Sequence, residues 1–158
     1  MKHLIGKLER TIVFVLKTCL YAALFISFFG IMGIDNPQLL RFSRTSGVTM
    51  LTFVVAGLGM TAAYGRYDIG KRKSKPIISS IGLATLITDI VTYIELSIMN
   101  TNPANNTEFK FESIGLFVIV VAVQVMCITV FTYGGNWIYF TLYDPERCCI
   151  VTSSRESF

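Results

Sequence analysis

Histidine and cysteine, which supply many metal ligands and nucleophiles in proteins, are scarce in this chain. The single histidine, His3, stands near the N-terminal end, where a solvated or headgroup-facing side chain is expected. Of the four cysteines, Cys19 and Cys127 lie in apolar stretches, where a free cysteine packs as a small hydrophobic residue. The adjacent pair Cys148 and Cys149 has no histidine nearby and lacks the ligand spacing of a zinc site. The sequence therefore predicts no disulfide scaffold, no metal centre and no cofactor.

Sequence signatures of catalysis are missing as well. The chain has no glycine-rich phosphate-binding loop and no nucleophile motif. Its 158 residues are largely taken up by apolar stretches, so that a soluble catalytic domain has no room. Catalysis by this chain alone is not expected, and the sequence leaves open whether the chain forms part of a larger enzyme.

Charged residues make up only 15% of the chain, whereas hydrophobic residues make up 53% and the mean hydropathy is +0.59. A helix that crosses a bilayer needs about 20 apolar residues. Lipid offers no hydrogen-bond partners to the backbone, so such segments must be helical. We expect four transmembrane helices at about 11–33, 48–64, 77–99 and 114–133. The predicted fold is an all-α membrane protein, with a four-helix transmembrane bundle in residues 1–134.

Two alternatives to four spans fit the sequence less well. A soluble four-helix protein would keep a polar face along each helix, whereas the runs 20–26 and 118–123 show none. A cleaved signal peptide would explain the first stretch, but that stretch exceeds the usual apolar region and lacks a convincing cleavage site. We therefore expect the first stretch to be the first membrane helix.

Basic residues are distributed unevenly about the predicted spans. Lys2, Lys7 and Arg10 precede the first span. A larger group surrounds the link between the second and third spans: Arg66, Lys71, Arg72, Lys73 and Lys75. The positive-inside rule then places both termini and this link in the cytoplasm, and the net charge of +4 reflects topology rather than a nucleic-acid partner. The larger group also suits contact with lipid headgroups or with a lipid-linked phosphate.

A stripe of polar side chains runs along the third span. Its members follow helical spacing of three and four, which places them on one face of the helix: Thr85, Thr88, Asp89, Thr92 and Glu95. Asp89 lies about twelve residues, or roughly 18 Å, from the start of the span and thus near the middle of the bilayer. An ionisable group at that depth is costly and is by default a functional candidate.

Two interpretations of the stripe stay open. In the first, the stripe faces the bundle interior, bonds neighbours such as Gln124, Thr18 or Tyr21, and holds the helices together. In the second, it lines a path for protons or for a substrate. Lys17 is a weaker partner for the aspartate, because it lies nearer the cytoplasm and its side chain can extend to the headgroups.

Small residues predict a packing surface and a helix end. Gly59 and Ala63 lie one turn apart in the second span, a spacing that lets helix backbones approach closely. Gly134-Gly135-Asn136 predicts the end of the fourth helix, because glycine and asparagine tolerate a left-handed cap. In the cytoplasmic tail that follows, residues 135–158, the segment Cys148-Cys-Ile-Val predicts a short buried strand. One strand alone cannot form a sheet.

Two stretches of the sequence resemble a known family. Tyr64-Gly-Arg-Tyr follows the second span, and Gly135-Asn-Trp-Ile-Tyr-Phe with Tyr143-Asp-Pro-Glu-Arg-Cys-Cys-Ile-Val follows the fourth. With them the chain resembles the membrane-anchor half of bacterial polyprenyl-phosphate sugar-1-phosphate transferases, which start exopolysaccharide, capsule or O-antigen synthesis. In that family similar segments lead into a Rossmann-like domain. The resemblance implies that residues 135–158 resemble the start of such a domain, truncated.

The chain departs from this family after the predicted strand. There the family has a glycine-rich turn, whereas this chain has Thr152-Ser-Ser. The family's catalytic region, with its basic helix and its aspartate-glutamate pair, does not occur in the sequence. No residue of this chain therefore inherits a catalytic or metal-binding role.

The resemblance implies a membrane anchor for a sugar-phosphate transferase, placed as a multi-pass protein in the bacterial inner membrane. Its expected partners are the lipid bilayer, polyprenyl phosphate and a separate or missing catalytic domain. The alternative function is a small independent transporter or flippase-like protein for lipid-linked sugars. In that case the stripe on the third span lines the path of the substrate.

Overall fold

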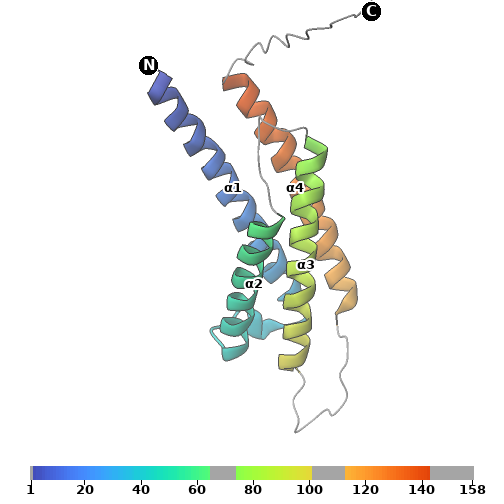
Figure 1. Ribbon diagram of the computed structural model, residues 1–158. Helices are drawn as coiled ribbons and strands as arrows, with labels where there is room; N and C mark the ends of the chain where they lie inside the picture. Colours follow the sequence, from blue (N-terminus) through green and yellow to red (C-terminus); the bar gives the residue numbers. More distant parts are fainter. Residues whose placement is uncertain (1, 65–73, 101–112, 143–158) are drawn as a thin grey trace, which may run out of the picture.

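The computed structural model describes residues 2–64, 74–100 and 113–142 of the chain. Four long helices form this part of the protein (Figure 1): α1 (Lys2–Met32), α2 (Arg44–Ala63), α3 (Ser74–Asn100) and α4 (Ile114–Leu142). A short 3-10 helix, η1 (Pro37–Leu39), lies between α1 and α2. Each long helix contains an apolar segment long enough to cross a membrane. The expectation of an all-α fold with four helices of that kind is confirmed for the described residues.

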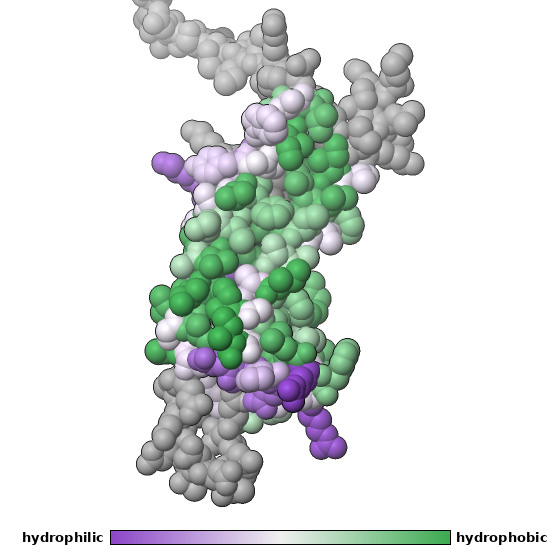
Figure 2. All heavy atoms as spheres, turned by 180° about the vertical axis from the view of Figure 1, so that it is seen from behind, coloured by the Kyte–Doolittle hydropathy of each residue, from purple (hydrophilic) through white to green (hydrophobic). Residues whose placement is uncertain are grey.

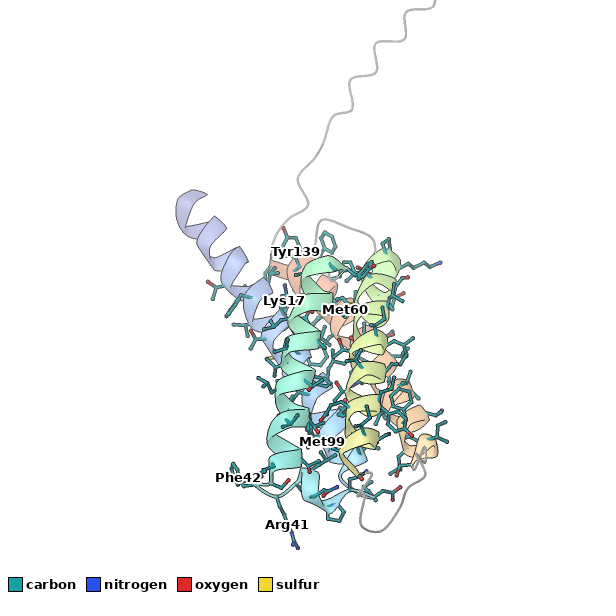
Figure 3. All side chains as sticks on the ribbon, turned by 60° about the horizontal axis from the view of Figure 1, so that its bottom comes forward. Lys17, Arg41, Phe42, Met60, Met99 and Tyr139 are labelled. Atoms are coloured by element: carbon teal, nitrogen blue, oxygen red, sulfur yellow. The ribbon has the colours of Figure 1, made fainter. Side chains whose placement is uncertain are left out.

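Successive helices run in opposite directions along the bundle (Figure 1). One end of the bundle therefore carries the start of α1, the end of α2, the start of α3 and the end of α4. We call it the basic end, because the link between α2 and α3, which is rich in basic residues, joins two helices there. In Figure 3, Lys17, Met60 and Tyr139 lie toward this end, whereas Phe42 and Arg41 lie at the other. Helix α2 packs against α3, α3 against α4, and α4 against α1.

Aromatic rings join α1 to α2 in the half of the bundle away from the basic end. Phe53 of α2 lies among three rings of α1, with ring centroids 5.6 Å from Phe25, 5.3 Å from Phe28 and 5.8 Å from Phe29. Such pairs contribute about 0.5–1.5 kcal/mol each beyond the area they bury. Because lipid weakens the hydrophobic drive between helices, contacts of this kind carry much of the packing.

The outward faces of the helices are apolar. Large side chains such as Phe14, Leu58, Met126 and Val130 are more than three-fifths exposed. Figure 2 shows apolar side chains along much of one face of the molecule, with hydrophilic ones gathered near one end. A soluble protein rarely exposes apolar patches of this extent. This surface suits contact with lipid, in keeping with the four apolar spans.

The predicted packing surface at Gly59 and Ala63 is wrong. Both residues are exposed, and a Cβ atom added to Gly59 would meet no atom within 4 Å. The buried residues of α2 instead include Thr49 and Phe53, and one turn further along Gly57 faces α3. A Cβ atom at Gly57 would lie 3.7 Å from Cγ2 of Thr88. The small residues do share one helix face, but that face lies on the outside of the bundle.

The predicted end of the fourth helix is also wrong, because α4 continues through Gly134 and Gly135 to Leu142. Gly135 is buried, and Nδ2 of Asn136 donates a hydrogen bond of 2.7 Å to Oγ of Ser74 at the start of α3. This contact holds the extra turns of α4 against α3. The predicted strand and the rest of the tail from residue 143 lie outside the described residues.

The turn after α1 provides a test of the packing. At Gly33 a Cβ atom would lie 2.7 Å from the backbone oxygen of Phe29 and 2.8 Å from Cγ of Leu40, which is too close for either contact. We therefore expect Gly33→Ala to lower the free energy of unfolding by about 1–3 kcal/mol, the usual cost of overpacking. Thermal unfolding in detergent, followed by far-UV circular dichroism, measures the change.

Gly30→Ala is the matched control, because a Cβ atom at Gly30 has no neighbour within 4 Å. Alanine in a helix interior is favoured over glycine by roughly 0.5–1 kcal/mol, so this variant should be at least as stable as the parent. Equal stability of the two variants would contradict the tight turn.

Candidate functional site

The polar stripe of α3 faces the interior of the bundle. Thr85, Thr88, Asp89 and Thr92 are buried, the last two completely, and Glu95 is half-buried. Asp89 therefore lies in the interior and away from the lipid-facing surface. The structure brings the whole stripe together on one face of one helix.

Two threonines of the stripe bond to their own helix. Oγ1 of Thr88 donates to the backbone oxygen of Ala84 at 2.9 Å, and Oγ1 of Thr92 donates to that of Thr88 at 2.8 Å. Such bonds to the preceding turn satisfy the hydroxyl donor inside a helix. With its hydroxyl bonded in this way, Thr88 turns its methyl group toward Gly57 of α2.

Asp89 is bonded to a second helix through Gln124. Nε2 of Gln124, on α4, donates to Oδ1 of Asp89 and to the backbone oxygen of Leu24 on α1, both at 3.3 Å. Both lengths lie slightly beyond the usual range of N–H···O bonds. One amide group thus connects α1, α3 and α4 in the interior. We call Asp89, Gln124 and Leu24 together the Asp89 node.

Of the expected neighbours of the stripe, only Gln124 bonds to Asp89 within the described residues. Thr18 is exposed and donates to the backbone oxygen of Phe14 at 3.0 Å. The buried hydroxyl of Tyr21 lies beside Thr61 of α2 and has no partner at bonding geometry among the described residues. The sequence pattern could find Gln124 because it is a rare amide within a long apolar helix.

Two oxygen atoms of the Asp89 node have no hydrogen-bond partner among the described residues. They are Oδ2 of Asp89 and Oε1 of Gln124, and both are buried. Both atoms are acceptors when the carboxyl group is ionised, whereas a protonated carboxyl group carries one O–H donor. A single proton on the carboxyl group of Asp89 would therefore add a hydrogen-bond donor to a node that has two unpaired acceptors. Chemically it can hold helices together or carry a proton.

Glu95 lies further along α3, away from the basic end. Thr49 of α2 lies beside its carboxyl group. Neither oxygen of that carboxyl group, nor Oγ1 of Thr49, has a hydrogen-bond partner at bonding geometry among the described residues. Glu95 is six residues from Asp89, roughly 9 Å along the helix axis, so the two acids do not form a carboxylate pair. In the described part of the chain, no three His, Cys, Asp or Glu side chains lie close enough to hold a metal ion.

Of the predicted headgroup contacts, the structure places only Lys75. It is exposed in the first turn of α3, at the basic end. The other four, Arg66, Lys71, Arg72 and Lys73, lie outside the described residues. On α1, Lys17 is half-buried, with Nζ 5.9 Å from the centre of the Tyr21 ring.

Two grooves on the bundle were not predicted from the sequence. One of about 320 Å³ lies between α3 and α4, where Thr85, Gly82 and Gln124 form part of its wall. The other, of about 420 Å³, lies between α1 and α2, beside Lys17 and Gly57. Grooves depend on how far neighbouring helices separate, which a pattern along one helix does not reveal. A small residue among large apolar ones is the available sequence signal at both.

Substitution of Asp89 tests whether the node stabilises the bundle. Asp89→Asn keeps an acceptor and adds donors, so we expect the free energy of unfolding to change by less than about 1 kcal/mol. Asp89→Leu leaves the buried amide of Gln124 without its side-chain partner, which costs about 1–3 kcal/mol. Unfolding in mixed micelles with rising denaturing detergent measures both variants.

Thr129→Val serves as the control for loss of a polar group, because Thr129 only donates to the backbone oxygen of Val125 within its own helix. It should change stability by less than about 0.5 kcal/mol. If Asp89→Leu is as stable as this control, the node does not hold the bundle together.

Comparisons of the chain with protein-family models, with curated proteins and with solved structures gave no match.

Proposed function

We propose that this chain is the membrane-anchor portion of a sugar-phosphate transferase that starts exopolysaccharide, capsule or O-antigen synthesis on polyprenyl phosphate. In this role it holds a separate or missing catalytic domain at the cytoplasmic face of the bacterial inner membrane. The observation that carries the proposal is that α2 ends, α3 begins and α4 ends at one end of the bundle (Figure 1). The basic link and the tail are therefore both attached to the basic end.

The chemistry of that end fits an enzyme acting on a lipid-linked phosphate. Basic residues near a membrane surface attract phosphate groups, and the link between α2 and α3 is rich in them. Trp137 and Phe140, in the last turns of α4, are exposed. Aromatic side chains at helix ends favour the level of the headgroups. A domain joined to the tail would thus start close to the phosphate of its lipid substrate.

The interior of the bundle favours an anchor over a transporter. A transport path needs polar groups that face the moving substrate, whereas Thr88 and Thr92 bond to their own helix. Asp89 is fully buried and bonded to Gln124. These bonds are those expected of side chains that hold helices together.

The alternative is a small transporter or flippase-like protein for lipid-linked sugars. One observation favours it: the groove between α3 and α4 reaches Thr85 and Gln124, so part of the polar stripe borders lipid. Under this alternative the unpaired Oδ2 atom of Asp89 would carry a proton or bind a sugar hydroxyl.

A flipping assay separates the two functions. The purified chain and its Asp89→Asn variant are placed in liposomes with a fluorescent polyprenyl-diphosphate sugar, and its transfer between leaflets is followed by quenching. For an anchor we expect both proteins to match protein-free liposomes. Transfer by the parent chain that Asp89→Asn abolishes would establish the alternative instead.

The DNA that follows the codon for Phe158 provides the positive test. An in-frame continuation, or an adjacent gene, that encodes a transferase catalytic domain is the expected result. A stop codon without such a neighbour would contradict the anchor function.

A further inference from the structure

The groove between α1 and α2 exists because these two helices separate toward the basic end. Their contact through Phe53 and the aromatic rings of α1 lies at the inner end of the groove. Beyond it, Gly57 contributes no side chain, and the groove of about 420 Å³ opens between the helices. That volume lies within the range of ligand-binding pockets. We propose that this groove binds one acyl chain of an anionic phospholipid, whose phosphate group contacts Lys17.

The length of the groove corresponds to one leaflet of a bilayer. On α1 it extends from Phe14 to Phe25, eleven residues or roughly 16 Å along the axis. On α2 it extends from Phe53, near the middle of the helix, to Thr61, near its end. Half of a hydrocarbon core about 30 Å thick is about 15 Å. An acyl chain of the leaflet at the basic end matches this length, whereas a polyprenyl chain is much longer.

The lining of the groove is apolar apart from a few groups. Phe14, Phe25, Val54 and Leu58 provide most of the surface that would contact a lipid chain. Val54, Leu58 and Phe14 are also substantially exposed on the outside of the bundle, so a lipid can enter from the side. The groove is therefore chemically suited to a hydrocarbon chain.

The positive charge of Lys17 favours an anionic headgroup on the bound phospholipid. Among the described residues, Lys17 is the one charged side chain in the lining of the groove, and no other of these residues forms an ion pair with it. The acids of the bundle interior, Asp89 and Glu95, belong to α3 and face Gln124 and Thr49. Basic side chains near a membrane surface attract anionic lipids, so a lipid phosphate is a suitable partner for Lys17.

The direction of Lys17 agrees with this contact. Side chains on a helix tilt toward its N-terminus, and α1 begins at the basic end. Lys17 lies seven residues, or roughly 10 Å, from the level of Leu24 in the interior. A lysine side chain at this depth extends to the headgroup level while its methylene groups stay in the apolar region. Its ammonium group thus reaches the phosphate of a lipid whose chain fills the groove.

Native mass spectrometry of the full chain tests the proposal. The protein is released from nanodiscs with equal amounts of phosphatidylglycerol and phosphatidylcholine, and the lipids that stay bound are counted. We expect the parent chain to retain phosphatidylglycerol preferentially. Lys17→Gln should reduce this preference about fivefold, as one lysine contact with an anionic lipid implies.

Two further variants make the test specific to the groove. Arg41→Gln removes one positive charge from an exposed position between η1 and α2, outside the groove and at the other end of the bundle (Figure 3), and should change the preference less than about twofold. Val54→Trp fills the groove from a lipid-exposed position and should remove the bound lipid although Lys17 is present. Far-UV circular dichroism confirms that each variant is folded.

Three results would overturn the proposal. Equal effects of Lys17→Gln and Arg41→Gln would mean that charge acts diffusely and not at the groove. Equal retention of both phospholipids by the parent chain would mean that no headgroup is selected. Displacement of phosphatidylglycerol by an equal amount of polyprenyl phosphate would assign the groove to a different lipid. Because the test does not involve sugar transfer, it stands apart from the proposed function.

Discussion

In a hydrocarbon environment, polar side chains find hydrogen-bond partners only within the protein, and this constraint organises the bundle. Gln124 of α4 meets it by bonding at once to Asp89 of α3 and to the backbone of Leu24 in α1. Helices α1 and α3 both pack on α4, so this amide lies where the three meet. Separating α3 from α4 would break the bond between the buried acid and the amide, and moving α1 away would break the bond to Leu24, so the amide favours one relative position of the three helices.

Helix α2 is held differently, and the difference explains the groove. It contacts α3 closely at Gly57 and meets α1 through the rings around Phe53. Both contacts lie toward the middle and the far half of the bundle, so the remaining turns of α2 separate from α1. Polar bonds join α1, α3 and α4, whereas between α1 and α2 the aromatic packing closes only the part of the interface away from the basic end and leaves the groove beyond it. Lys17 stands at that opening.

The sequence predicted the features that depend on composition and on periodicity within one helix. Four long apolar runs identified the four spans, and the spacing from Thr85 to Glu95 placed the stripe on one face. Gln124 could be expected as a partner because a polar group inside a membrane must bond to another. The sequence could not predict which face of α2 meets α3, because both faces carry small residues: Gly57 on one, Gly59 on the other.

The end of α4 could not be predicted from the sequence either. Glycine and asparagine permit a helix to stop but do not require it, and the bond from Asn136 to Ser74 keeps α4 helical beyond that point. The groove between α1 and α2 could not be predicted either, since it results from the separation of two helices. Features that depend on contacts between helices were thus not predicted from the sequence, whereas features that depend on the residue pattern within one helix were.

The structural role of the Asp89 node underlies both the stability of the bundle and the choice of an anchor over a transporter. A double-mutant cycle with Asp89→Leu, Gln124→Leu and the combined variant tests it most directly, with the free energy of unfolding in micelles as the measured quantity. We expect a coupling free energy of about 1 kcal/mol, within the range of hydrogen bonds measured between membrane helices. Additive effects, within about 0.3–0.5 kcal/mol, would show that the two side chains act independently and would contradict the account.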